Sequence, residues 1–267
     1  SPEAAVKEVL GTSGTAAVEF AAIRKEFRLP PQFPAAVEAE AHAATHPPNR
    51  VPKGRTDLRK LLVVTIDPED AKDFDDALSL TPLPNGNMEL GVHIADVSHY
   101  VTEGSALDAE ALKRGNSTYL VDGVVPMLPE HLSNDICSLV PNKPRFAFSV
   151  FMEFTPKGAR KGYRIEETLI LSKRRFTYDE AQKVIESGTG DHAELITSLH
   201  RLARTLYTQR MKNGGIDFET QEVKFQLDKD LMPVCAVVKT RTDATSLVEE
   251  CMLAANKTVA EHLHNLK

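Results

Sequence analysis

The chain has 267 residues, of which 42% are hydrophobic, enough to form a sizeable core in one large domain or two small ones. The formal net charge of −6 and an isoelectric point near 5.9 argue against a simple basic nucleic-acid-binding domain. The sequence has no membrane-length apolar run and no signal-peptide pattern, so neither membrane insertion nor secretion is expected.

The first 54 residues are predicted to form a helical lead-in with a structural role. Helices are expected over Ala16–Phe27 and Ala35–Ala44, separated by a proline-rich segment. Residues 46–55, H-P-P-N-R-V-P-K-G-R, predict an extended linker because prolines recur along them. The domain boundary is therefore placed after residue 54, so that residues 55–267 form the second region.

Beyond the linker, short apolar runs and turn residues predict strands followed by helices. Strands are expected over residues 61–66, 76–80, 88–95, 146–154, 164–171, 223–227 and 234–239, and helices over residues 106–115, 178–187, 192–213 and from 245 onward. P-N-G-N at 84–87 and P-K-G at 156–158 predict hairpin turns. The predicted fold class is α+β, with a mainly antiparallel sheet and helices packed against it.

The most informative stretch is Thr65–Leu80, T-I-D-P-E-D-A-K-D-F-D-D-A-L-S-L. Five aspartates and a glutamate fall between Asp67 and Asp76, and apolar runs flank them on both sides. Like charges held beside a core are unfavourable unless a cation compensates them. Hard divalent cations take oxygen ligands, so the stretch predicts a Mg²⁺ site, with Mn²⁺ as the other candidate, acting on a phosphate ester.

Two other interpretations of this stretch are weaker. A solvated charge run would not have apolar flanks on both sides. A calcium-binding EF-hand loop needs glycine at its sixth position, but that position is Lys72 when counted from Asp67 and Leu78 when counted from Asp73.

Four segments together resemble the ribonuclease II and ribonuclease R family of exoribonucleases, which share the RNB catalytic domain. They are I-D-P-E-D-A-K-D-F-D-D-A-L at 66–78, G-V-H-I-A-D-V-S-H-Y-V at 91–101, R-G-N-S-T-Y-L-V-D-G-V-V-P-M-L-P-E-H-L-S-N-D-I-C-S-L at 114–139 and L-V-E-E-C-M-L-A-A-N at 247–256. The resemblance covers residues 55–267 and lies nearer to ribonuclease R. It implies Mg²⁺-dependent, processive 3′→5′ hydrolysis of single-stranded RNA to 5′-mononucleotides by a hydrolase.

The resemblance assigns the four essential acidic positions to Asp67, Asp73, Asp75 and Asp76. Asp67 and Asp76 are expected to hold the main ion and Asp73 a second one, as in two-ion phosphoryl chemistry. Asp75 is expected to contact the terminal ribose hydroxyls, which would help to distinguish RNA from DNA.

Three further residues are assigned to RNA binding by the resemblance. Tyr119, in S-T-Y-L-V-D, and Phe218, in G-G-I-D-F-E-T, would stack on bases, whereas a half-buried strand aromatic is the plainer interpretation of each. Glu249 matches a carboxylate near the scissile end.

His93 and His99 are expected to be structural. The basic residues of K-R-R at 173–175, with Arg201, Arg204, Arg210 and Lys212, are equally consistent with phosphate contacts and with a solvated surface.

The family domain continues past the position that matches Lys267, into an arginine-bearing segment that this sequence does not contain. The chain is therefore expected to be an incomplete catalytic domain, and the isolated chain is expected to have low activity or none. A non-catalytic RNA-binding homologue is the alternative, and a phosphatase of small esters lacks a use for the two aromatic residues. The three cysteines form no C-x-x-C pair, which predicts reduced thiols in a cytoplasmic protein.

Overall fold

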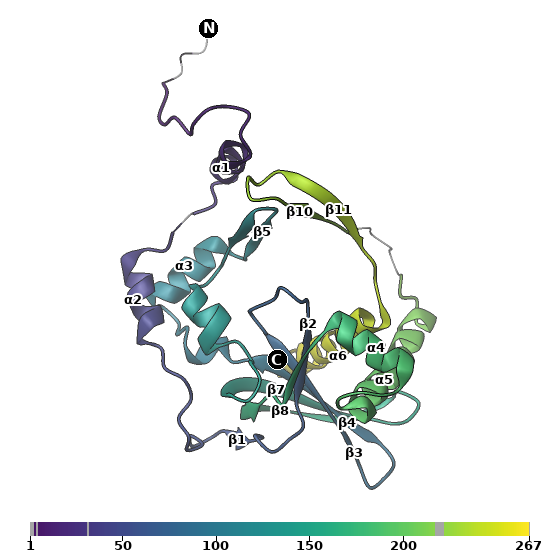
Figure 1. Ribbon diagram of the computed structural model, residues 1–267. Coiled ribbons are helices and arrows are strands. Elements are labelled where there is room, and N and C mark those ends of the chain that lie inside the picture. The colour runs from purple at the N-terminus through teal and green to yellow at the C-terminus, as the bar shows by residue number, and fades with distance from the viewer. Residues whose placement is uncertain (1–2, 4, 31, 217–221, 267) are drawn as a thin grey trace. The chain divides into compact units, whose positions relative to one another are not determined.

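The structure is a computed structural model that describes residues 3, 5–30, 32–216 and 222–266 (Figure 1). The chain divides into two compact units. The smaller comprises residues 1–41, 103–129 and 220–240, and the larger comprises residues 42–102, 130–219 and 241–267. The predicted boundary after residue 54 stays a prediction.

The larger unit is built on a seven-stranded sheet. Its strands are β1 (Thr56–Asp57), β2 (Val64–Asp67), β3 (Asp76–Pro82), β4 (Met88–Ala95), β7 (Pro144–Phe154), β8 (Arg160–Leu171) and β9 (Arg174–Thr177). They lie in the order β1-β8-β7-β4-β3-β2-β9, and only the β1–β8 and β2–β9 pairs are parallel. The predicted α+β class with a mainly antiparallel sheet is confirmed.

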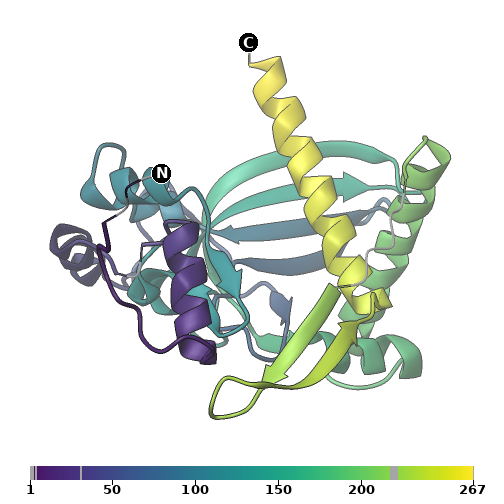
Figure 2. The same cartoon turned by 90° about the horizontal axis from the view of Figure 1, so that it is seen from above.

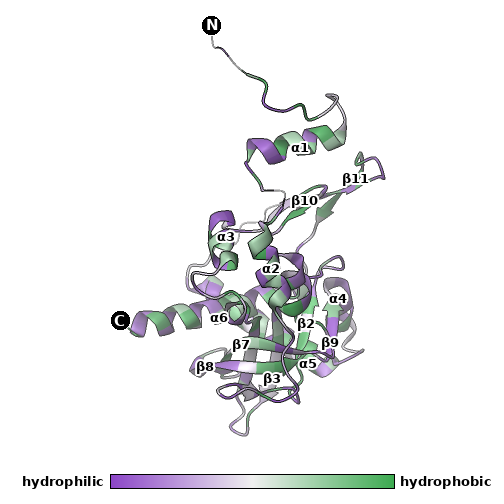
Figure 3. Cartoon of the chain, turned by 90° about the vertical axis from the view of Figure 1, so that its left-hand side faces the viewer, coloured by the Kyte–Doolittle hydropathy of each residue, from purple (hydrophilic) through white to green (hydrophobic). Residues whose placement is uncertain are grey.

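Three helices pack on one face of this sheet and form the hydrophobic core with it. They are α4 (Tyr178–Ser187), α5 (Ala193–Lys212) and α6 (Asp243–Asn265). A capping box between Thr177 and Glu180 fixes the start of α4. Figure 2 shows α6 crossing the strands, and Figure 3 shows apolar and polar residues alternating along it, as expected of a helix with one buried face.

The side of the sheet that faces away from this core contains a buried polar network centred on His93. The His93 side chain is fully buried; its Nε2 lies 2.9 Å from Ser79 Oγ and its Nδ1 lies 2.7 Å from Ser149 Oγ. Burial lowers the pKa of His93 to about 3, so the ring is neutral near pH 7. These contacts support the structural role expected for His93.

His93 is expected to make the protein less stable as the pH falls. Its pKa is about 3 in the fold and about 6.5 in an unfolded chain, so between these values the unfolded state binds a proton that the folded state does not. The free energy of unfolding should therefore decrease by about 2 kcal/mol between pH 7 and pH 5 through this residue alone.

Urea unfolding of the wild type and of His93→Gln at both pH values measures this contribution. His93→Gln should be less stable at pH 7 because the network is disturbed, but it should lose less stability on acidification. All other titrating groups are common to the two proteins and cancel in the difference. Equal pH dependence in both proteins would contradict the assignment.

The smaller unit contains α1 (Ala16–Glu26), α3 (Ala106–Arg114) and α2 (Ala35–Ala43) except for its last two residues. It also contains the hairpins β5–β6 (Thr118–Leu120 and Gly123–Val125) and β10–β11 (Glu222–Leu227 and Pro233–Lys239). The Glu40 carboxylate accepts hydrogen bonds from the amides of Ala106 and Leu107, the first residues of α3. A carboxylate there satisfies amides that have no partner within the helix. Arg24 forms an ion pair with Asp122 at 2.8 Å.

The structure corrects several predicted elements. The predicted strand 61–66 begins three residues too early: Leu61, Leu62 and Val63 precede β2, and the Leu61 amide donates to the Leu58 carbonyl. Strand β9 was missed because Arg174 and Arg175 form part of a basic run without an apolar pattern. The short strands β1, β5 and β6 were also missed, as was a π-helical turn over His131–Ile136.

Candidate metal and catalytic site

The acidic stretch forms the connection between two neighbouring strands of the larger unit; residues 67–76 are called the aspartate loop. Asp67 is the last residue of β2 and Asp76 is the first residue of β3, so the sheet fixes both ends of the loop. Asp73 and Asp75 lie in the irregular segment between them. The two strands are adjacent in the sheet, so both ends of the loop lie at the same end of this strand pair.

Three of the four predicted acidic residues have raised pKa values. Burial, and then the Asp76 carboxylate, raise the pKa of Asp67 to about 7. Burial, and then the Asp73 carboxylate, raise the pKa of Asp75 to about 6. Burial, and then the Asp75 carboxylate, raise the pKa of Asp76 to about 6. The loop thus gathers carboxylates whose ionised forms are unfavourable without a compensating positive charge.

The side chains of the four aspartates are chemically suited to binding a hard divalent cation. All four side chains offer carboxylate oxygens, and Oδ2 of Asp67 is buried without a hydrogen-bond partner among the described residues. Within the same part of the chain, no three His, Cys, Asp or Glu side chains already surround a common point as in a completed metal site. The structure therefore shows the donors but not their coordination geometry.

Two residues from other elements hold the backbone of the loop. Arg175, on β9, donates from Nη2 to the carbonyls of Pro68 (2.5 Å) and Glu69 (2.9 Å). Ser138, before β7, contacts the second half of the loop through its hydroxyl: Oγ donates to the Lys72 carbonyl at 2.8 Å and accepts from the Phe74 amide at 3.0 Å. Both lie far from the loop in sequence, and sequence reasoning identified neither as supporting it.

Tyr178, the first residue of α4, is a further neighbour of the loop that the sequence did not indicate. Burial and the carboxylates of Asp76 and Asp67 raise the pKa of its phenol to about 12. The phenol therefore stays protonated at neutral pH and can donate a hydrogen bond toward the carboxylates.

The predicted RNA-binding residues have different surroundings. Tyr119 lies on β5 of the smaller unit, where its side chain is 72% exposed, so it is not a core aromatic. Phe218 lies outside the described residues. Glu249, on α6, is paired with Arg241 at 2.8 Å, whereas the adjacent Glu250 is buried and paired with Arg210. The RNA-binding roles of Tyr119, Phe218 and Glu249 stay predictions.

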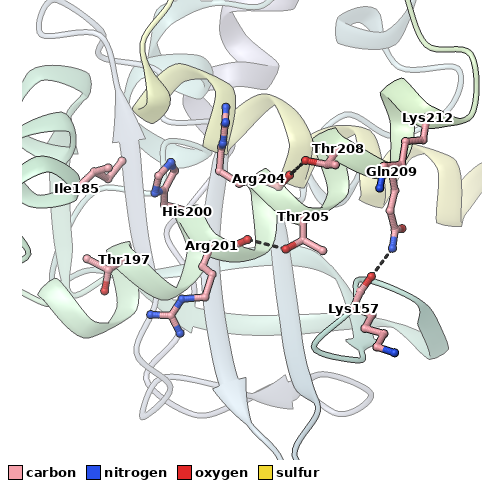
Figure 4. Close-up of a pocket in the computed structure, with 10 residues that line it drawn as sticks. All are labelled: Lys157, Ile185, Thr197, His200, Arg201, Arg204, Thr205, Thr208, Gln209 and Lys212. Carbon is pink, nitrogen blue, oxygen red and sulfur yellow. Dashed lines mark hydrogen bonds between the residues drawn. The ribbon is translucent and has the colours of Figure 1, made fainter.

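A separate open cavity of about 660 Å³ lies along α5 (Figure 4). Four of its lining residues are basic: Lys157, Arg201, Arg204 and Lys212. None of its lining residues belongs to the aspartate loop. The positive charge of these residues is suited to binding anions, but no residue that lines the cavity has a carboxylate that could take part in the predicted chemistry.

Comparison with known proteins identifies the family. The family model described as the RNB domain matches residues 55–267. The chain belongs to the RNB-domain family. Ribonuclease R of Thermotoga maritima is 46% identical over 98% of the chain, and ribonuclease R of Chlamydia trachomatis is 43% identical over 98%. The chain spans 38% of the length of each of these two proteins.

Solved structures agree with the RNB assignment. Mycoplasma genitalium RNase R, solved with ribose-methylated single-stranded RNA, has a TM-score of 0.91 and 32% identity, covering 97% of this chain and 41% of that one. Yeast Ssd1, described as a pseudonuclease, has a TM-score of 0.65 and 21% identity, covering 79% of this chain and 26% of that one, which shows a shared fold alone. Among the described residues of the RNB chain, no helix is both long and apolar enough to cross a membrane.

Proposed function

We propose that this chain is the metal-binding part of an exoribonuclease that hydrolyses RNA processively from the 3′ end to 5′-mononucleotides. The observation that carries the proposal is the aspartate loop, in which the pKa values of Asp67, Asp75 and Asp76 are raised, within an RNB domain. Clustered carboxylates of this kind are a common feature of phosphodiester-cleaving sites that use divalent cations.

Each aspartate has a proposed role. Asp67 and Asp76 would hold the main ion and Asp73 the second, with Mg²⁺ as the proposed cation and Mn²⁺ as the other candidate. When bound, such ions supply an activated water and stabilise the leaving oxygen. Asp75 would accept hydrogen bonds from the ribose hydroxyls of the last nucleotide, which selects RNA over DNA.

The proposed substrate is the 3′ end of single-stranded RNA, and the proposed location is the cytoplasm. The exposed ring of Tyr119 supports a stacking contact with a base, because a base can stack only on an aromatic face that is accessible. Glu249 would act near the scissile end. Stacking tolerates every base, as processive degradation requires.

A non-catalytic RNA-binding homologue is the second candidate, supported by the fold shared with the pseudonuclease Ssd1. The presence of all four aspartates favours the enzyme over this alternative. Incubating the full-length protein with RNA whose 3′ end is free or blocked, with Mg²⁺ or with EDTA, separates the two. Mononucleotides should appear only with a free 3′ end and Mg²⁺; RNA binding without any cleavage would support the non-catalytic homologue.

Replacing Tyr119 by alanine in the full-length enzyme is expected to lengthen the final oligonucleotide product rather than stop cleavage. Each base stacked on an aromatic ring contributes about 1–3 kcal/mol, so its loss should release short RNAs earlier. Product lengths on a sequencing gel measure this effect, and Tyr119→Phe, which keeps the ring, is the control. An unchanged end product in Tyr119→Ala would exclude Tyr119 as the stacking residue.

A further inference from the structure

The backbone of the aspartate loop is held in part by contacts with other elements. Within the loop, the described backbone bonds comprise one turn in which the Ala71 amide donates to the Pro68 carbonyl. The Asp75 carbonyl accepts from the Ala95 amide of β4, which fixes the last part of the loop. A loop that carries several like charges needs such external contacts, because the charges tend to spread apart.

The segment Ser138–Leu139 supplies the largest set of these external contacts. The Ser138 side chain is fully buried, and its hydroxyl satisfies both the Lys72 carbonyl and the Phe74 amide. The Leu139 amide donates to the Phe74 carbonyl at 2.9 Å. The backbone on both sides of Asp73, and directly before Asp75, is thereby fixed in position.

Ser138 is itself held by Arg145, near the start of β7. The Arg145 side chain is 2% exposed, and its Nε donates to the Ser138 carbonyl at 2.8 Å. Its other nitrogens donate to the carbonyls of Asp135 and Pro144, each at 3.0 Å. A planar guanidinium that binds three carbonyls fixes the segment rigidly against the sheet.

We infer that Ser138, supported by Arg145, is a positioning residue that holds Asp73 of the aspartate loop in the geometry required for metal binding and Asp75 in the position proposed for its contact with the ribose. The inference rests on the proposed function. Ser138 acts through the backbone of Lys72 and Phe74, which its hydroxyl contacts. Removing the hydroxyl leaves the Phe74 amide and the Lys72 carbonyl without this partner, so the loop should sample other conformations.

The primary test is Ser138→Ala in the full-length protein, with Ser149→Ala as the matched control. Ser149 is also a fully buried serine with two side-chain contacts, to His93 and Thr168, but it lies in the sheet away from the loop. Hydrogen exchange of the metal-free proteins reports on the loop directly. Exchange of the peptide that contains Phe74 should accelerate in Ser138→Ala and stay unchanged in Ser149→Ala.

The second readout is binding of Mn²⁺ alone, followed by electron paramagnetic resonance without RNA. Loss of a group that orients metal ligands typically weakens affinity 10- to 100-fold, and we expect about tenfold for Ser138→Ala. Ser149→Ala should keep the wild-type affinity.

Unchanged exchange of the Phe74 peptide together with wild-type Mn²⁺ affinity in Ser138→Ala would overturn the inference. If this variant does not fold, Ser138→Cys keeps the shape of the side chain with a much weaker hydrogen bond and decides the same question. Failure of the wild type itself to bind Mn²⁺ or cleave RNA would refute the proposed function instead; the exchange measurement would then still show whether Ser138 holds the loop.

Discussion

Replacing Asp76 by asparagine in the full-length enzyme is expected to abolish RNA hydrolysis while RNA affinity changes little. The amide keeps the shape of the side chain but removes the negative charge that would bind the main ion. Residual activity should be well below about a tenth of the wild-type rate, since losing one ligand removes most of the several kcal/mol that metal binding contributes to catalysis. The measurement is a time course of mononucleotide release beside an RNA-binding titration.

The same substitution is expected to stabilise the metal-free protein at pH 8. Burial raises the pKa of Asp76 from 3.8 to about 6, so between these pH values the folded state retains a proton that the unfolded state has lost, and stability decreases across this range. At pH 8 the carboxylate is charged in both states and this loss of stability is complete. Asparagine has no charge to bury and removes this loss. Asp230→Asn, in the exposed β10–β11 turn, is the control and should change neither property. Activity above a tenth of wild type in Asp76→Asn would refute the assignment of Asp76.

Replacing Arg55 by alanine is expected to destabilise the larger unit strongly. The Arg55 and Asp96 side chains are 6% and 3% exposed, and Nη2 of Arg55 lies 2.5 Å from Oδ2 of Asp96. The guanidinium also lies 4.1 Å from the centre of the Phe146 ring. Removing one partner of a buried ion pair leaves an uncompensated charge, which costs about 3–5 kcal/mol. Urea unfolding gives the change in the free energy of unfolding.

Arg59→Ala is the matched control for Arg55→Ala. Arg59 also pairs with an aspartate, at 2.7 Å from Asp57, but both side chains are substantially exposed, so its loss should destabilise the protein much less than the loss of Arg55. The double variant Arg55→Ala with Asp96→Asn removes both charges and should recover part of the lost stability. Arg55→Ala costing no more than Arg59→Ala would contradict the importance of burial for this pair.

The fold could be predicted from sequence wherever local signals were strong. The predicted ends of the strand Met88–Ala95 and of the helix Tyr178–Ser187 agree with the structure, because a P-N-G-N turn precedes the first and a capping box begins the second. Strand β9 could not be predicted in this way. Its arginines pair with β2 at the edge of the sheet, and a four-residue polar edge strand has no hydrophobic alternation.

The same distinction between local and tertiary signals applies to the residues of the candidate site. Asp67 and Asp76 were identifiable because the carboxylates lie in one short stretch between apolar strands. Ser138, Arg175 and Tyr178 were not, because each reaches the loop only through the tertiary structure and has no distinctive local pattern. Sequence therefore indicates which groups can carry the chemistry, whereas the contacts that hold them depend on pairings between distant segments.

The parallel pairing of β2 with β9 has a consequence for the order of folding. In the described ladders, β2 meets β3 at one residue pair, Val64 with Leu78, but meets β9 at four, from Val64 with Arg174 to Asp67 with Thr177. Contacts between residues so far apart in the chain form slowly, since a long loop must close first. Hairpins such as β3–β4 should therefore form early, and Asp67 should reach its final position only late, when β9 docks. During synthesis, Asp67 would therefore reach its native position, and the native affinity proposed for a cation, only after residue 177 had left the ribosome.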